Sequence, residues 1–334
     1  MSLRTSVSLL GFGLLAFAAA AADDWQISGP FTHENLSVYL VHAGPRAAVK
    51  SNLLPLQEAM AQQKVAVYET GNVSRLSIEN TSSEDVYVQS GDIVKGGQQD
   101  RVLTTDFVLP AHSGKLPIAS FCVEQGRWSK RGAESATQFN ASTQAVPSKA
   151  LKMAVKDSGS QSAVWSSVAV SRAKLAGAAG LAAMPATGLT ASTSMQMAMD
   201  IKPVADATEP YTKALSKVAD NKADVIGYVY AINGEINSAE IYSSSELFRR
   251  MWPKLLRASA TEALAERPKA KPAAAPAIPV VKSALTEVER GKESSRNSAG
   301  GSTVVRKEAA KTVLFETHDS KAGAGWIHRS YLVK

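Results

Sequence analysis

Residues 225–242 have the sequence VIGYVYAINGEINSAEIY, which gives the clearest local prediction in the chain. Two runs rich in Val, Ile and Tyr lie on either side of the dipeptide Asn233-Gly234. Asn-Gly suits the two positive φ angles of a type I′ turn, and such a turn joins two antiparallel strands. The segment therefore predicts a β-hairpin with strands at 225–232 and 235–242.

A helix is predicted directly after this hairpin. Ser243 and Glu246 have the spacing of a capping box, in which two side chains satisfy free backbone N–H groups at a helix start. Pro253 lacks a backbone donor, so we expect the helix to kink or restart after Met251. Apolar residues at helical spacing predict a face that packs on the core: Leu247, Phe248, Met251, Trp252, Leu255 and Leu256.

Most of the chain before the hairpin has the composition of strands separated by polar turns. Runs rich in Val, Leu, Ile and Tyr predict strands at 36–41, 65–69, 76–79, 86–89, 101–108 and 116–123. Helices are predicted at 54–62 and from about Val164 to Leu175, and a terminal hairpin at 312–317 and 326–332. This pattern indicates an α+β fold, with an antiparallel, sandwich-like sheet and a few packed helices in one compact domain.

Changes in composition divide the 334 residues into four segments. Residues 1–22 combine Arg4, an apolar run and a small-residue end, which is the pattern of a secretory signal peptide, so we expect a periplasmic or secreted protein. Residues 23–266 form the α+β domain. Residues 267–302 are expected to form a flexible basic linker, in which 267–278 is rich in Ala, Pro and Lys, 291–302 is rich in Gly and Ser, and a short helix can form between the two stretches. Residues 303–334 form the terminal hairpin, which we expect to return to the main domain.

The excess of basic residues is concentrated near the C-terminus. The net charge is +7, and residues 267–312 hold ten Lys or Arg and four Glu, an excess of six. The rest of the chain is nearly neutral, which argues against nucleic-acid binding by the folded domain. The linker predicts, at most, a weak contact with an anionic cell envelope.

The single cysteine, Cys122, excludes an internal disulfide. Its apolar neighbours predict a buried and unreactive thiol, because free cysteine behaves mostly as a small hydrophobic residue.

The densest group of polar functional residues lies at 91–128, with the sequence GDIVKGGQQDRVLTTDFVLPAHSGKLPIASFCVEQGRW. The two glycines at 96–97 predict a turn whose backbone N–H groups converge on an anion. Arginine supplies forked donors for phosphate or carboxylate, and tryptophan can stack on a base or sugar. Asp92 and Glu124 are candidates for a catalytic acid or base. The candidate ligand-binding residues are Lys95, Gly96, Gly97, Gln98, Arg101, Gln125, Arg127 and Trp128.

The same polar residues also suit a structural role. A buried network of arginines, acids and amides ties loops together, and the sequence leaves both interpretations open. The chain has no P-loop, GxSxG, HExxH or CxxC motif, and its five histidines show no metal-ligand spacing. We therefore predict no cofactor and no metal site.

Four short runs carry a resemblance to a known family. They are GGQQDR at 96–101, CVEQGRW at 122–128, AVW at 163–165 and MWPKLL at 251–256. These runs resemble the ARG and rhodanese-phosphatase-superfamily-associated protein domain, over roughly residues 30–266 and the terminal hairpin. The family name implies a link to ADP-ribose or nucleotide chemistry, and the resemblance brings no established reaction with it.

Two classes of function follow from these observations. The first is an exported small-molecule ligand-binding or interaction module, with a small anionic or nucleotide-like ligand. The alternative is a hydrolase that acts on a phosphorylated or glycosidic small molecule through Asp92 or Glu124. An acid that faces an open pocket beside Arg101 and Arg127 would favour the enzyme, whereas mutual burial of these groups favours a structural network.

Overall fold

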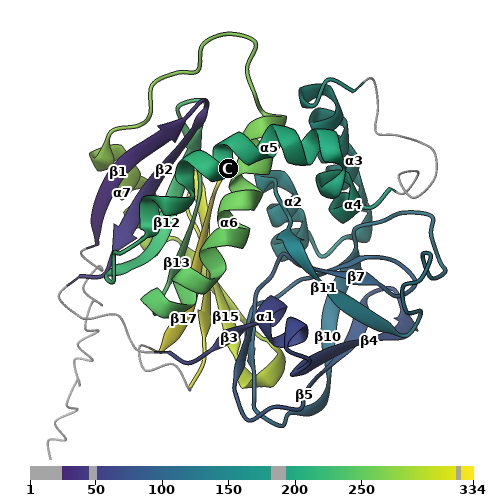
Figure 1. Ribbon diagram of the computed structural model, residues 1–334. Coiled ribbons are helices and arrows are strands. Elements are labelled where there is room, and N and C mark those ends of the chain that lie inside the picture. The colour runs from purple at the N-terminus through teal and green to yellow at the C-terminus, as the bar shows by residue number, and fades with distance from the viewer. Residues whose placement is uncertain (1–24, 45–50, 182–192, 321–324) are drawn as a thin grey trace, which may run out of the picture.

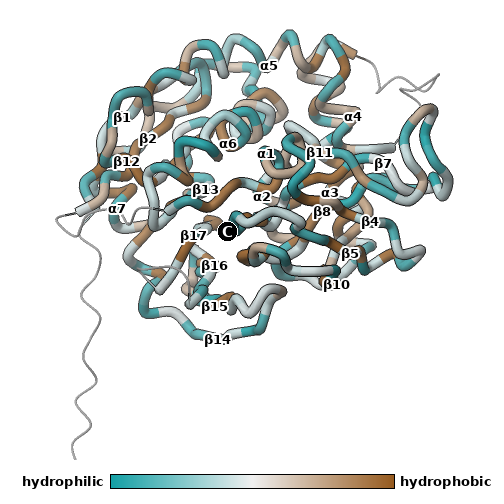
Figure 2. Tube along the Cα trace, turned by 60° about the horizontal axis from the view of Figure 1, so that its bottom comes forward, coloured by the Kyte–Doolittle hydropathy of each residue, from teal (hydrophilic) through white to brown (hydrophobic). Residues whose placement is uncertain are grey.

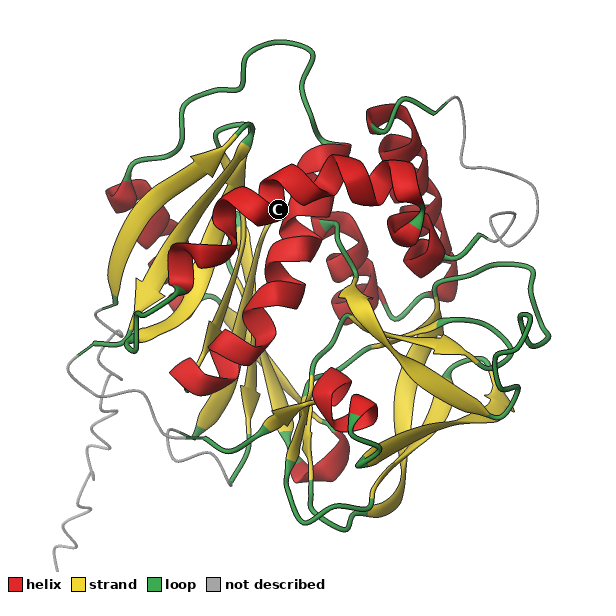
Figure 3. Ribbon diagram, viewed as in Figure 1, coloured by secondary structure: helices red, strands yellow, loops and turns green. Residues whose placement is uncertain are grey.

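The computed structural model describes residues 25–44, 51–181, 193–320 and 325–334. The predicted signal peptide at 1–22 lies outside these ranges. The described chain forms an eight-stranded sheet, a closed six-stranded barrel and a small three-stranded sheet, with helices packed between and around them (Figures 1 and 3). Almost all strand pairs are antiparallel, and the α+β prediction is confirmed.

The eight-stranded sheet combines strands from both ends of the chain. Its spatial order is β1 (Gln26–His33), β2 (Leu36–His42), β12 (Val225–Ile232), β13 (Glu235–Tyr242), β17 (Trp326–Val333), β16 (Thr312–His318), β15 (Thr303–Glu308) and β14 (Lys292–Asn297). The predicted hairpin forms its centre, and Asn233 and Gly234 have φ angles of 54° and 82°, as a type I′ turn requires. The terminal hairpin returns to the main body because β17 pairs with β13.

Helices cover both faces of this sheet. Successive strand residues point to opposite faces, and Val38 and Leu40 of β2 pack in the core that contains α5 (Lys202–Leu215) and α6 (Ser245–Ala265). Tyr39 and Val41 pack on the other face, with the buried side chains of α7 (Ile278–Thr286). The apolar run at 38–41 in β2 therefore reflects a strand that is buried on both sides.

Helix α6 differs from its prediction at two points. Its N-cap is Ser244, whose hydroxyl accepts a hydrogen bond from Leu247 N at 3.3 Å, because Ser243 N already donates to Ile327 O in the sheet. The helix also continues through Pro253 without a restart. Proline costs about 3 kcal/mol inside a helix, but each large apolar side chain buried on the following turns contributes about 1.5–3 kcal/mol.

The barrel lies beside the large sheet and contains the 91–128 segment (Figure 1). Its strands, in order around the barrel, are β10 (Gly114–Cys122), β5 (Arg75–Asn80), β4 (Val65–Asn72), β11 (Gln138–Ala145), β7 (Asp92–Gly96) and β8 (Arg101–Leu103). The predicted single strand at 101–108 is wrong, because residues 104–106 separate β8 from β9 (Phe107–Leu109). The latter strand belongs to the small sheet with β3 (Leu54–Pro55) and β6 (Val86–Val88).

The remaining helices pack mainly around the barrel and along α6. They are α1 (Leu56–Ala61), α2 (Lys149–Met153), a π-helical turn (Ala154–Ser158), α3 (Gln161–Ala178), α4 (Met195–Asp200) and a 3₁₀ turn after α5 (Ser216–Ala219). Within the ranges that the structure describes, no helix is long and apolar enough to cross a membrane.

Residues 267–302 contain the short helix expected between the two linker stretches and, in addition, a strand. Residues 267–277 contain no helix or strand, whereas α7, two 3₁₀ turns (Glu287–Arg290 and Ala299–Gly301) and β14 occupy most of the remainder. Val281 and Leu285 of α7 are buried against the sheet. All six residues of β14 are exposed, and the strand is largely hydrophilic in Figure 2. Strands at the edge of a sheet commonly carry polar and charged residues. An edge strand such as β14 can therefore have the same composition as a linker.

Candidate functional site

The turn after β7 does bring backbone N–H groups onto anions, but the anions belong to the chain itself. Gly96 N donates to Asp100 Oδ1 at 2.9 Å, and Gln98 N donates to Glu69 Oε2 at 3.2 Å. Gly97 has a φ angle of 54°, and a Cβ atom there would lie 2.4 Å from the ring of Phe139. The turn therefore requires glycine, and carboxylates of the protein occupy the position that the sequence assigned to a ligand.

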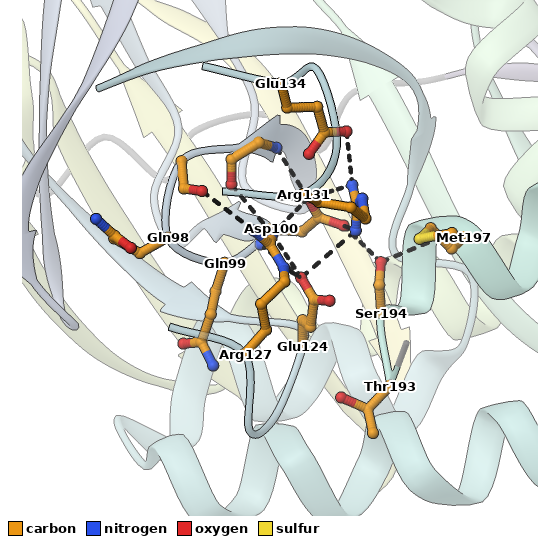
Figure 4. Close-up of polar contacts among 12 residues, drawn as sticks. Gln98, Gln99, Asp100, Glu124, Arg127, Arg131, Glu134, Thr193, Ser194 and Met197 are labelled. Atoms are coloured by element: carbon orange, nitrogen blue, oxygen red, sulfur yellow. Dashed lines mark hydrogen bonds and ion pairs between the residues drawn. The ribbon is translucent and has the colours of Figure 1, made fainter. Parts of the chain in front are cut away.

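Asp100 is the centre of a buried polar cluster (Figure 4). Arg131 donates two hydrogen bonds to its carboxylate, both at 3.1 Å. Ser194, which caps α4, donates a third at 2.6 Å from a segment 94 residues away in sequence. Asp100 therefore holds together the barrel turn, the 126–134 loop and the start of α4.

Glu124 is the second buried acid of this cluster. Arg127 donates to Glu124 Oε2 from Nε at 2.8 Å, and Arg131 Nη1 lies 3.5 Å from the same oxygen. Arg127 also donates to the carbonyl oxygens of Gly97, at 3.1 Å, and Ser129, at 2.5 Å. Its guanidinium group therefore points into the loops that it joins (Figure 4).

Arg101 extends the cluster on the barrel side. It is fully buried, with Nη2 at 3.4 Å from Glu69 Oε2 and Nη1 donating to Gln99 O at 3.1 Å. The guanidinium carbon lies 5.5 Å from the ring centre of Trp128, which is 48% exposed. Trp128 thus covers a buried arginine and shields it from solvent.

The other candidate residues do not join into one site. Lys95 pairs with Asn140 across β7 and β11 and is half-buried, and Gln98 is half-buried in the turn. Gln125 is exposed, and its backbone exchanges hydrogen bonds with Thr193 Oγ1. Asp92 lies apart from the cluster, where it forms a buried ion pair with Lys254 of α6.

By the criterion of mutual burial, the Asp100–Glu124 cluster has the geometry of a structural network. Its acids and arginines satisfy one another, and none of them lines the pocket described below. Cys122 is also buried, and burial raises the pKa of its thiol to about 11. This environment is that of an unreactive thiol.

A second buried polar network was not predicted from the sequence. His328 of β17 is fully buried, with Nδ1 2.6 Å from Asp106 Oδ2 and Nε2 2.9 Å from Glu240 Oε2. The contact between Nε2 and Glu240 Oε2 is short enough for an ion pair, but its geometry is not that of a hydrogen bond. Lys152 lies 3.4 Å from Glu240, and Lys156 lies 3.7 Å from Asp106.

Opposite charges determine the ionisation of this network. Burial opposes the imidazolium form, but the two carboxylates outweigh it and raise the pKa of His328. Burial likewise opposes the carboxylate of Glu240, and Lys152 and His328 overcome it and lower its pKa to about 2. The pKa of Asp106 also falls below its usual range, because Lys156 and His328 outweigh its burial. His328 is therefore held as a cation between two anions.

A pocket of about 390 Å³ lies between α2, α3, the C-terminal part of α6 and the turn that joins β12 to β13. Serine hydroxyls from α3 and asparagine side chains from the hairpin provide much of its polar lining. The residues that matter for its chemistry are Ser148, Lys149, Ser167, Lys174, Asn237 and Glu262. Small-molecule sites typically measure about 300–1,000 Å³, so the pocket has the size of a site for a small ligand.

Glu262 connects this pocket with the buried network. It lines the pocket and is only 4% exposed. Its Oε1 accepts from Lys149 N at 2.7 Å, and its Oε2 accepts from Tyr230 O–H at 2.8 Å. The hydroxyl of Tyr230 in turn accepts from Lys152 Nζ at 3.3 Å, and Lys152 contacts Glu240. A chain of polar contacts thus leads from the pocket wall to His328.

Metal binding has no candidate among the described residues, because they contain no group of three or more His, Cys, Asp or Glu side chains that could hold a metal ion.

The chain matches the family profile of the ARG and Rhodanese-Phosphatase-superfamily-associated Protein domain over residues 24–332. It belongs to this family. No curated protein and no solved structure matches the chain. The bounds of the match enclose α7 and β14 as well as the barrel and the large sheet.

Sequence reasoning missed several residues of these sites in the family domain. Arg131 and Ser194 complete the Asp100 cluster, but they lie in Ser- and Ala-rich stretches without a recognisable motif. The pocket was missed because its lining combines single polar, charged and apolar residues from separate segments, and no motif connects them. One signal in the sequence was Glu262. It is an acidic residue in the helix whose apolar residues pack on the core, so its carboxylate needs a polar partner if it is buried.

Proposed function

We propose that the chain is an exported small-molecule-binding module whose ligand occupies the pocket between α2, α3, α6 and the β12–β13 turn. The observation that carries the proposal is the pocket itself, with a volume of about 390 Å³ and a buried carboxylate, Glu262, in its wall. Export rests on the signal-peptide pattern of residues 1–22.

The arrangement of the pocket favours binding of a ligand in a preformed site. Its wall comes from four separate elements, and Asn237 and Glu262 are both less than a tenth exposed. Side chains held by surrounding secondary structure lose little entropy when a ligand binds. The hydrolase alternative receives no comparable support, because Asp92 and Glu124 are both buried in ion pairs.

A thermal-shift screen with a metabolite library tests this proposal. A ligand at 100 times its Kd stabilises the folded protein by about 2.7 kcal/mol, which corresponds to a rise of several degrees in Tm. In Ser167→Trp, an indole from α3 fills the pocket and should abolish the shift. Ala169→Trp is the matched control, because Ala169 is exposed on the same helix and does not line the pocket.

The expected result is a ligand that stabilises the wild type and Ala169→Trp equally and does not stabilise Ser167→Trp. A ligand that stabilises Ser167→Trp as strongly as the wild type binds elsewhere, and the proposed site is then wrong.

A further inference from the structure

The charges in the pocket distinguish between classes of ligand. Lys174 Nζ and Glu266 Oε1 are 2.5 Å apart and neutralise each other at the rim. Of the other charged groups in the lining, Lys149 contributes one positive charge, and Glu235 and Glu262 contribute two negative charges. The pocket therefore has a net charge of about −1, and its most buried charge is the carboxylate of Glu262.

Glu262 has capacity to accept further hydrogen bonds. Its two donors, Lys149 N and Tyr230 O–H, are both uncharged groups, and it forms no ion pair with any residue of the described ranges. An ionised carboxylate offers about four lone-pair positions, so the two donors from the protein leave room for a ligand. A buried carboxylate of this kind favours hydroxyl or ammonium donors and repels phosphate.

The remaining lining suits the surface of a sugar. Ser166, Ser167 and Asn237 offer groups that can both donate and accept hydrogen bonds, which matches the hydroxyls of a polyol. Val170 and Ile236 add apolar contact area, and Val170 is 52% exposed. No aromatic side chain lines the pocket in the described part of the chain, so it lacks a stacking surface for a nucleobase.

We propose that the pocket binds a sugar-sized ligand that presents hydroxyl or ammonium donors to Glu262 and carries no net negative charge. This inference rests on the proposed function and specifies its ligand class. It departs from the anionic or nucleotide-like ligand that the sequence suggests, because the arginines behind that expectation are occupied by Glu69, Asp100 and Glu124.

Titration calorimetry with three matched probes tests the inference: glucose, glucosamine and glucosamine 6-phosphate. Glucosamine should bind at least tenfold more tightly than its phosphate, because the phosphate introduces negative charge next to Glu262. Glu262→Gln keeps the size of the side chain and removes its charge, and it should weaken glucosamine binding at least tenfold while changing glucose binding less. Glu246→Gln, at the exposed start of the same helix, should leave all three affinities within twofold.

The outcomes separate the ligand class from the site. Tighter binding of the phosphate, abolished by Ser167→Trp, would overturn the ligand class and retain the pocket. Glucosamine binding that Ser167→Trp leaves intact would overturn the pocket as well. If none of the three probes binds at millimolar concentration, the ligand class is wrong, while a different library ligand that Ser167→Trp blocks would still support the site.

Discussion

Replacement of Arg127 by alanine separates a ligand-binding role from a structural one. The sequence analysis gives Arg127 as a candidate ligand-binding residue, and loss of a side chain that contacts only a ligand would leave stability nearly unchanged. In the structure, its guanidinium group contacts Glu124, which is 1% exposed, and the carbonyl oxygens of Gly97 and Ser129. These contacts predict a loss of folding free energy.

The magnitude follows from the partners that remain. A hydrogen bond to a charged group contributes about 1.5–3 kcal/mol, and loss of one partner from a buried ion pair costs about 3–5 kcal/mol. Glu124 keeps Arg131 at 3.5 Å, which compensates part of the charge. We therefore expect Arg127→Ala to lower the free energy of unfolding by about 2–4 kcal/mol.

Urea denaturation followed by far-UV circular dichroism measures this change. Arg249→Ala provides the control, because Arg249 is exposed on α6 and its side chain donates a hydrogen bond to Ser245 O within its own helix. That variant should remain within about 0.5 kcal/mol of the wild type. If Arg127→Ala also stays within that range, the cluster does not stabilise the fold, and the structural interpretation of Arg127 is wrong.

Three further predictions concern pH, the thiol and the linker. The pKa of His328 is raised in the folded protein, so its contribution to stability is complete below the unfolded pKa of about 6.5 and is lost as pH rises through the folded value. Urea titrations at increasing pH should show this loss of unfolding free energy in the wild type and not in His328→Gln. If the unfolding free energy changes with pH equally in both proteins, the prediction is contradicted. Cys122 should react with DTNB only after denaturant is added, and rapid labelling of the native protein would contradict its burial. Trypsin should cleave after Lys269 before Lys282, because Lys282 lies in α7, and equal rates would argue against the packed helix.

The parts of the fold that were predicted are those determined by neighbouring residues. The Asn233-Gly234 turn requires only two residue types and two flanking apolar runs, and it appears as predicted. Errors occurred where a distant partner changed the local outcome. Ser243 has the spacing of an N-cap, but its backbone N–H is taken by Ile327, 84 residues later, and the helix starts one residue further on.

The candidate site was harder to predict for the same reason. The polar residues at 91–128 do form a dense cluster, but glycines, arginines and acids look alike in sequence whether the bound anion is a ligand or a carboxylate of the chain. Asp106 and His328 lie 222 residues apart, so no local pattern could indicate their contact. Arg131 and Ser194 have no flanking motif that marks their role.

The buried charges are placed where one part of the fold meets another. Asp92 of the barrel pairs with Lys254 of α6, Asp100 of the barrel turn binds Ser194 at α4, and Asp106 next to the small sheet pairs with His328 of the large sheet. Apolar contacts are not directional, so several relative positions of barrel and sheet would bury similar areas. A buried carboxylate left without its partner is costly, so only the position that matches these pairs is stable. We therefore interpret the three aspartates as residues that fix the positions of the barrel and the small sheet relative to the helices and the large sheet. This role explains why these polar residues of the 91–128 segment form contacts within the protein.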